Sequence, residues 1–116
     1  MFLLDLLDYQ LKDIEDHPDK VDWTGCAFYN VLPEELMRKN QSYFNSNTWL
    51  YISIYQTLSE DFIRDFQNEL SWTWVSCNQN LSKEFIVEFA DKVYFWGLID
   101  NENISKEIKQ FCKMFI

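Results

Sequence analysis

A repeat with a period of 23 residues runs through the C-terminal two-thirds of the chain and constrains its fold more than any other feature. One column of the repeat is apolar and consists of Leu58, Leu81 and Ile104. A second column is aromatic and consists of Trp49, Trp72 and Phe95. An earlier unit that contains Trp23 and Leu32 fits the same pattern if three residues are inserted near 45–47. Repetition at this spacing predicts similar structural units stacked along the chain.

Within each unit the apolar residues follow the period of an α-helix. Phe62, Ile63, Phe66 and Leu70 fall at i, i+1, i+4 and i+8, which is the spacing of an apolar stripe on one helix face. The stripe recurs one period later as Phe85, Ile86, Phe89 and Val93. We therefore expect a helix that buries one face, and we expect it to be the longer of two helices in the unit.

Residues with capping side chains stand where these helices should begin. Ser59 and Ser82 are placed to accept a hydrogen bond from a free backbone N–H of the first turn. A second, shorter helix is predicted to start at the aromatic column, after the cap residues Asp22, Thr48 and Ser71. A helix of about eight residues is unstable alone, so neighbouring units must hold it.

The composition agrees with a helical fold, because 116 residues include only two glycines and two prolines, too few for the turns of a β-sandwich. With 47% hydrophobic residues the chain can bury a core. We predict one all-α domain over residues 1–116, in which short helix-turn-helix repeats stack into a small α-solenoid-like bundle. The expected units are about 23–48, 49–71, 72–94 and 95–116, after an acidic N-terminal cap at 1–22.

Charge and cysteine usage limit the partners and the compartment. A net charge of −9 would repel nucleic acid and anionic membranes, so neither is expected as a direct partner. The start of the chain is interrupted by Asp5 and Asp8 and has no basic region, which argues against a signal peptide or a membrane span. Three widely spaced cysteines and one histidine argue against a disulfide framework or a zinc site. These features favour a reducing, cytoplasmic location.

The segment from Leu58 to Phe66, Leu-Ser-Glu-Asp-Phe-Ile-Arg-Asp-Phe, continues to Leu-Ser-Trp at residues 70–72. It resembles a short tryptophan-containing helical repeat of bacteriophage and large DNA virus proteins. The resemblance is strongest over residues 49–93, and it implies a helical stack and a phage or viral origin. The family has no catalytic residues that could be assigned to this chain. Pro33, Lys109 and Cys112 depart from the pattern, as residues of terminal units commonly do.

No residue pattern in the chain points to catalysis. His17 has no second histidine or cysteine at ligand spacing. Cys26 and Cys112 occupy columns filled elsewhere by core residues, while Cys77 occupies a less constrained position. Carboxylate pairs such as Asp61 with Asp65 fall on the polar helix face, where an enclosed acid–base site is not expected. We predict a non-enzyme without a cofactor or metal ion.

Two surfaces are candidates for binding a partner. Tyr51, Trp74 and Trp96 occupy positions that vary between units, and such aromatic residues often anchor interfaces, although packing between units is an equal alternative. The other candidate is the acidic N-terminal stretch, which either replaces the phosphates of a nucleic acid or only solubilises the chain. Its carboxylates are Asp5, Asp8, Asp13, Glu15, Asp16, Asp19 and Asp22.

These observations predict a protein-binding module of a phage or virus. Its partner would be a host protein with a basic surface, and binding would inhibit that protein, for instance a component of antiviral defence as anti-CRISPR proteins do. Two alternatives stay open. One is an acidic nucleic-acid mimic that blocks a nucleic-acid-binding enzyme, and the other is a structural or scaffold repeat protein that forms homo-oligomers.

The repeat register makes a direct prediction about stability. Phe66 and Phe89 occupy the same step of the same stripe, so both should be buried. Phe66→Ala and Phe89→Ala should each lower the free energy of unfolding by about 3–5 kcal/mol, because each leaves a cavity in the core. Urea denaturation measures this, and an unchanged midpoint in both variants would show that the register is wrong.

Overall fold

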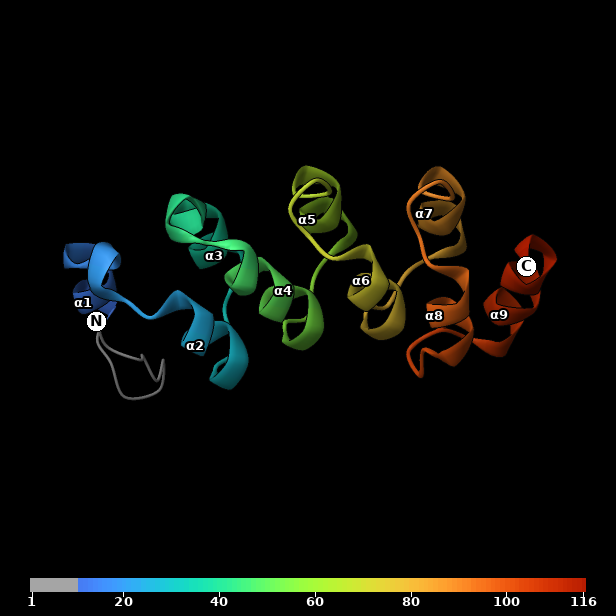
Figure 1. Cartoon of the computed structure of the whole chain (residues 1–116), viewed down its shortest axis with the longest axis horizontal. Coiled ribbons are helices and arrows are strands. Elements are labelled where there is room, and N and C mark those ends of the chain that lie inside the picture. The colour runs from blue at the N-terminus through green and yellow to red at the C-terminus, as the bar shows by residue number, and fades with distance from the viewer. Residues whose placement is uncertain (1–10) are drawn as a thin grey trace. The chain divides into compact units, whose positions relative to one another are not determined.

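A computed structural model describes the backbone of residues 11–116 and the side chains from Ile14 onward (Figure 1). Every regular element in this part of the chain is helical, and no β-strand occurs in it. The prediction of an all-α fold is therefore confirmed. The chain divides into two compact units, Met1–Gln56 and Thr57–Ile116.

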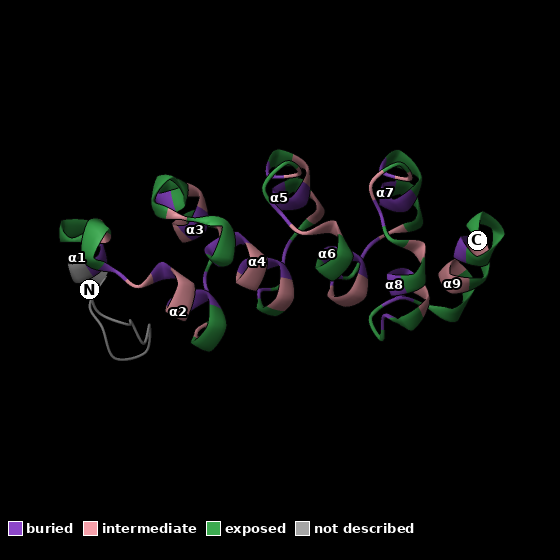
Figure 2. Ribbon diagram, viewed as in Figure 1, coloured by how far each residue is buried: buried purple, intermediate pink, exposed green. Residues whose placement is uncertain are grey.

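The first unit holds four short α-helices and two 3-10 turns in its described part. In chain order they are α1 (Leu11–Asp16), η1 (Pro18–Lys20), α2 (Trp23–Tyr29), α3 (Glu34–Asn40), η2 (Gln41–Tyr43) and α4 (Ser46–Tyr55). Helices α2 and α4 pack against each other. Cys26, Ala27 and Ile52 are fully buried and belong to the core of this unit (Figure 2).

The second unit holds five short α-helices and a terminal 3-10 turn. They are α5 (Glu60–Asp65), α6 (Trp72–Asn78), α7 (Lys83–Glu88), α8 (Phe95–Asp100), α9 (Lys106–Cys112) and η3 (Lys113–Phe115). Within this unit α5 lies beside α7 in one layer, and α6 packs on α8 in the other (Figure 1). Helix α9 then packs on α8.

Equivalent residues of successive repeats have equivalent surroundings. Phe66 and Phe89 are 8% and 6% exposed, so both are buried as the register predicts. The ring of Phe66 lies 4.6 Å from the ring of Phe62, and the ring of Phe89 lies 4.6 Å from that of Phe85. The repeat in the sequence is therefore a repeat in side-chain packing.

The helix predicted to be the longer one in each unit is in fact short. Helix α5 has six residues and ends at Phe66, where φ is −113° and ψ is 27°. Two side chains bond to backbone carbonyls near this helix end. The Gln67 amide donates to the Arg64 carbonyl of the last turn at 2.9 Å, and the Trp72 indole donates to the carbonyl of Gln67, in the turn after the helix, at 2.9 Å. Trp23 donates in the same way to the carbonyl of Pro18, also at 2.9 Å. In these two repeats the tryptophan of the aromatic column ties its helix, α2 or α6, to the turn before it.

Three serine caps lie where the sequence predicts them or continue the same column. The hydroxyls of Ser59, Ser82 and Ser105 accept hydrogen bonds from the backbone N–H three residues later, in α5, α7 and α9 respectively. Asp22 caps α2 by accepting from the N–H of Gly25 at 3.1 Å. These local signals were sufficient to place the helix starts.

Of the two other predicted caps, Thr48 is wrong, and Ser71 is right in position but makes no capping hydrogen bond. Helix α4 starts at Ser46, and its N-cap is Asn45, so Thr48 lies inside the helix. Asn45 and Thr48 exchange side-chain and backbone hydrogen bonds in a capping box, which explains why the helix begins earlier. Ser71 is the N-cap residue of α6, but its hydroxyl makes no capping hydrogen bond.

A buried glutamine joins the ends of α2 and α4 in the first unit. Gln56 is 4% exposed and stands at the C-cap of α4. Its amide nitrogen donates to the carbonyls of Ala27 and Asn30, at 2.9 and 2.7 Å. Its amide oxygen accepts from the N–H of Leu32 at 2.8 Å. One side chain thus satisfies three backbone groups where α2 ends and the following loop begins.

In the second unit a buried asparagine bonds to the repeat-equivalent carbonyls. Asn101, fully buried after α8, donates to the carbonyls of Ser76 and Gln79, both at 2.8 Å. Ser76 and Gln79 correspond in the repeat to Ala27 and Asn30. The oxygen of the Gln79 side chain accepts from the N–H of Leu58 at 2.9 Å. We refer to Gln56, Gln79 and Asn101 as the bridging amides.

Removing a bridging amide should destabilise the protein more than its size suggests. Gln56→Leu keeps an apolar stem of similar volume but leaves two carbonyls and one N–H without that partner in a buried place. We expect a loss of about 3 kcal/mol or more in the free energy of unfolding. The exposed Gln110→Leu is the matched control and should change it by less than about 0.5 kcal/mol. Equal effects in the two variants would show that the bridge contributes little.

Candidate functional site

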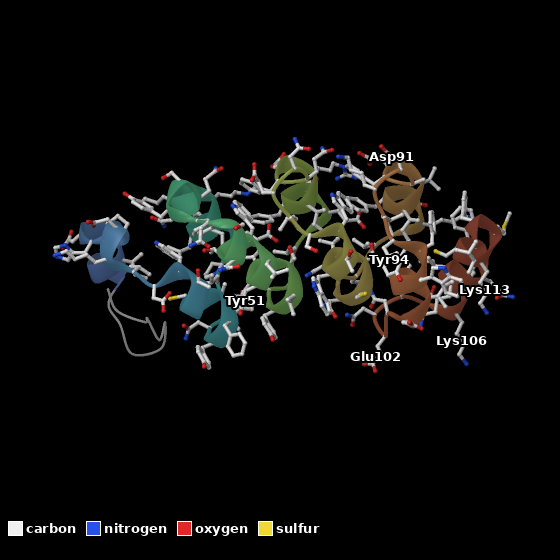
Figure 3. All side chains as sticks on the ribbon, in the orientation of Figure 1. Tyr51, Asp91, Tyr94, Glu102, Lys106 and Lys113 are labelled. Atoms are coloured by element: carbon white, nitrogen blue, oxygen red, sulfur yellow. The ribbon has the colours of Figure 1, made fainter. Side chains whose placement is uncertain are left out.

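Four aromatic side chains gather at the surface of the first unit. Phe28 and Tyr29 come from the end of α2, and Tyr51 and Tyr55 come from α4 (Figure 3 labels Tyr51). Phe28, Tyr29 and Tyr55 are 41%, 70% and 51% exposed, and Tyr51 is half-buried. We call these four residues the aromatic cluster.

Phe28 stands at the centre of the cluster. Its ring centroid lies 4.5 Å from that of Tyr29, 5.5 Å from that of Tyr51 and 4.8 Å from that of Tyr55. The interplanar angles are 64°, 86° and 64°, so the rings meet edge to face. This is a favourable geometry for aromatic pairs, and it limits the motion of rings that still face solvent.

The helices place these rings outward because their other faces form the core. On α2, Cys26 and Ala27 are fully buried just before Phe28. On α4, Tyr51 and Tyr55 are four residues apart and share one face, while Ile52 is buried on another. The exposed rings are therefore carried by helices whose opposite faces are packed in the core of the unit.

The three aromatic candidates from the sequence have different surroundings. Tyr51 is part of the aromatic cluster in the first unit. Trp74 on α6 and Trp96 on α8, both in the second unit, are 40% and 56% exposed. The two tryptophans therefore face solvent rather than filling the core of their unit, while Tyr51 packs at its edge. Binding by any of the three stays a prediction.

Sequence reasoning missed most of the aromatic cluster. Tyr29 and Tyr55 occupy one repeat column that continues with Asn78 and Asn101, so the column varies between units. Tyr51 was selected because its position varies between units. Applied to more than the first two positions after the aromatic column, the same criterion would have selected Tyr29 and Tyr55 as well. Phe28 was missed although its column, which continues with Ile54, Cys77 and Asp100, also varies between units.

The acidic candidates are only partly described. Asp5 and Asp8 lie outside the described residues, and the side chain of Asp13 is not described either. The remaining members are Glu15, Asp16 and Asp19, which are exposed, and Asp22, which is half-buried at the cap of α2.

The second unit carries a basic surface on α9 and at the start of η3. Lys106, Lys109 and Lys113 line a hollow of about 330 Å³ together with Ile99 and Gln110 (Figure 3 labels Lys106 and Lys113). The negative charge of the chain is therefore not spread evenly over its described surface.

The exposed carboxylates of α5 and α7 form ion pairs with an arginine. Arg64 donates to both oxygens of Glu88, at 3.0 Å from Nε and 2.9 Å from Nη2, and to Asp61 at 2.9 Å. Its guanidinium also lies over the ring of Phe85, 5.3 Å from the centroid. The hydrogen bond from Arg64 lowers the pKa of Glu88, so this carboxyl stays ionised. These groups fit a solvated ion-pair network rather than an acid–base pair.

The cysteines lack the surroundings of a reactive thiol. Cys26 and Cys112 are fully buried, and Cys77 is half-buried. Burial raises the pKa of the Cys77 thiol, and the nearby charge of Asp100 raises it further. Burial also raises the pKa of Cys112. His17 is exposed at the start of η1. Between Leu11 and Ile116, no three His, Cys, Asp or Glu side chains gather as metal ligands would.

Comparison with protein-family models, curated proteins and solved structures finds no match for this chain. None of the helices in the described part is long and apolar enough to cross a bilayer.

The raised pKa of Cys77 predicts slow alkylation. At pH 8 iodoacetamide should modify Cys77 more slowly than free cysteine, because less of the thiol is ionised. Asp100→Asn removes a negative charge, lowers the pKa of Cys77 and should speed the reaction by up to about threefold. Peptide mapping by mass spectrometry measures the rate, with the exposed Asp91→Asn as control. A rate above that of free cysteine would mean that Cys77 is activated.

Proposed function

We propose that this chain is a non-enzymatic protein-binding module and that the aromatic cluster is its contact surface. The observation that carries the proposal is the gathering of four rings on one helix pair, three of them more than 40% exposed. A monomeric protein seldom leaves neighbouring large aromatic side chains in water without a use for them.

The geometry of the cluster suits an interface anchor. Tyrosine and phenylalanine bury a large area on binding and lose little conformational freedom, since each has only two side-chain torsions. Edge-to-face contacts around Phe28 already limit the rings before a partner arrives. Less entropy is then lost in the complex, which favours slow dissociation.

The resemblance to a repeat of bacteriophage and large DNA virus proteins suggests the biological setting that we propose. A phage or viral accessory protein of this size would act in the host cytoplasm by binding and inhibiting a host protein, such as a component of antiviral defence. A net charge of −9 would speed association with a partner that has a basic surface.

Nucleic-acid mimicry is the second candidate, favoured by the exposed carboxylates Glu15, Asp16 and Asp19. A mimic needs negative charge along its whole contact surface, and the lysine-lined hollow of α9 breaks that continuity if the contact extends to the second unit. Affinity that falls steeply with salt would support mimicry, whereas affinity anchored by aromatic residues changes little.

The proposal predicts which substitutions abolish binding. A partner captured from host lysate by the wild-type chain should be lost by the Tyr29→Ala/Tyr55→Ala variant. Its Kd should rise about 30-fold or more, the cost of removing a true anchor of about 2 kcal/mol. Isothermal titration calorimetry with the purified partner measures this.

Tyr43→Ala provides the matched control, since Tyr43 is 46% exposed in the same unit but lies on η2, outside the aromatic cluster. It should bind like the wild type. Charge reversal at Glu15, Asp16 and Asp19 should mainly slow association. Full affinity in the double tyrosine variant, together with loss of binding on charge reversal, would reject the aromatic surface in favour of the mimic.

A further inference from the structure

A hollow beside the aromatic cluster combines aromatic walls with a carboxylate. It measures about 310 Å³ and is lined by Asp22, Thr24, Gly25, Phe28, Tyr29 and Tyr51, all of which belong to the first unit. Three of the six lining residues are aromatic. Asp22 is the single charged residue among them.

The aromatic walls stand at steep angles to one another. The ring of Phe28 makes angles of 64° with Tyr29 and 86° with Tyr51, so the three do not form a flat stack. The faces of aromatic rings carry partial negative charge, and they attract a cation within about 6 Å. Walls set at angles let one group contact more than one ring.

A glycine, Gly25, lines the hollow between Asp22 and the rings. Gly25 occupies the column that continues with Tyr51, Trp74 and Gly97, so two of the other three units carry an aromatic side chain at this position. Such a side chain at position 25 would fill the space between Asp22 and the rings. The absence of a side chain at Gly25 therefore leaves the space between Asp22 and the rings open.

The electrostatics favour a cation over an anion. Asp22 accepts a hydrogen bond from the N–H of Gly25 at 3.1 Å, and this neutral donor leaves the negative charge of the carboxylate in place. The start of α2 contributes an opposing partial charge, at most about half an elementary charge and less for a helix of seven residues. The net charge of −9 adds to the attraction for a basic group.

We infer that this hollow binds the guanidinium of an arginine side chain presented by the partner protein. A guanidinium is planar, so it can stack on a tyrosine or phenylalanine ring while its edge donates hydrogen bonds to a carboxylate. The inference rests on the proposed function, because it names the group that the aromatic surface recognises. The rings of Phe28, Tyr29 and Tyr51 contact the cation, and Asp22 pairs with it.

The test uses the full chain and a minimal probe, N-acetyl-arginine methylamide, titrated by two-dimensional NMR. The amide signals of residues 22–29 and of Tyr51 should shift and saturate, with a Kd on the order of millimolar. The citrulline analogue has the same shape without the charge, and it should bind at least about tenfold more weakly. Equal binding of the two compounds would overturn the inference.

Two variants locate the site without removing a ring. Asp22→Asn keeps a good N-cap residue but loses the charge, and it should weaken arginine binding about fivefold or more. Gly25→Leu fills the hollow with a better helix former and should abolish binding. Asp19→Asn is the control for a lost exposed carboxylate, and it should bind like the wild type. Unchanged binding in Asp22→Asn or Gly25→Leu would exclude this hollow as the site.

The result separates the inference from the proposed function. If the Tyr29→Ala/Tyr55→Ala variant loses the captured partner but the wild-type chain does not bind the arginine probe, the interface stands and the cation site is wrong. If the probe binds in the hollow but the double variant keeps the partner, the cation site stands and the proposed interface is wrong.

Discussion

The amide groups of Gln56 and Asn101 donate hydrogen bonds to the carbonyl groups that end α2 and α6, the equivalent helices of the preceding repeats. The rest of the fold depends on this contact. The helices of the described part have six to ten residues, a length at which an isolated helix does not persist in water. Their terminal carbonyls would be costly to bury without partners. For α2 and α6 a side chain from the next repeat supplies these partners, so each of these two helices is completed by its neighbour.

This arrangement leaves the outer faces of the short helices free to vary. Backbone satisfaction comes from Gln56 and core packing from residues such as Ile52, both on the inner side. Tyr51 and Tyr55 on the same helix contribute neither of these, although their rings pack against Phe28. An aromatic surface can therefore be built on α4 without altering the contacts that hold the unit together.

Features that arise within one turn of helix could be predicted from the sequence. The serine caps and the apolar stripe through Phe66 are local, and the structure has them where the pattern indicates. The length of α5 could not be predicted, because it depends on side chains from beyond the helix: Gln67 bonds to the Arg64 carbonyl of the last turn, and Trp72 bonds to the turn that follows. The bridging amides were missed for a related reason, since Gln56 is a polar residue whose partners lie 24 to 29 positions away.

The position and size of Asn101 limit how such an array of repeats can change by mutation. Gln56 and Gln79 occupy the same position of the repeat, and Asn101 lies one residue before that position. The asparagine side chain is one methylene shorter than the glutamine side chain. Helix α8 is correspondingly one residue shorter than α6. The two differences compensate, because the earlier backbone position lets the shorter amide of Asn101 reach the carbonyls of Ser76 and Gln79, which are equivalent to those that Gln56 reaches. A substitution of asparagine for Gln56 alone would fall short of them, so residue and helix length have to change together in the divergence of these repeats.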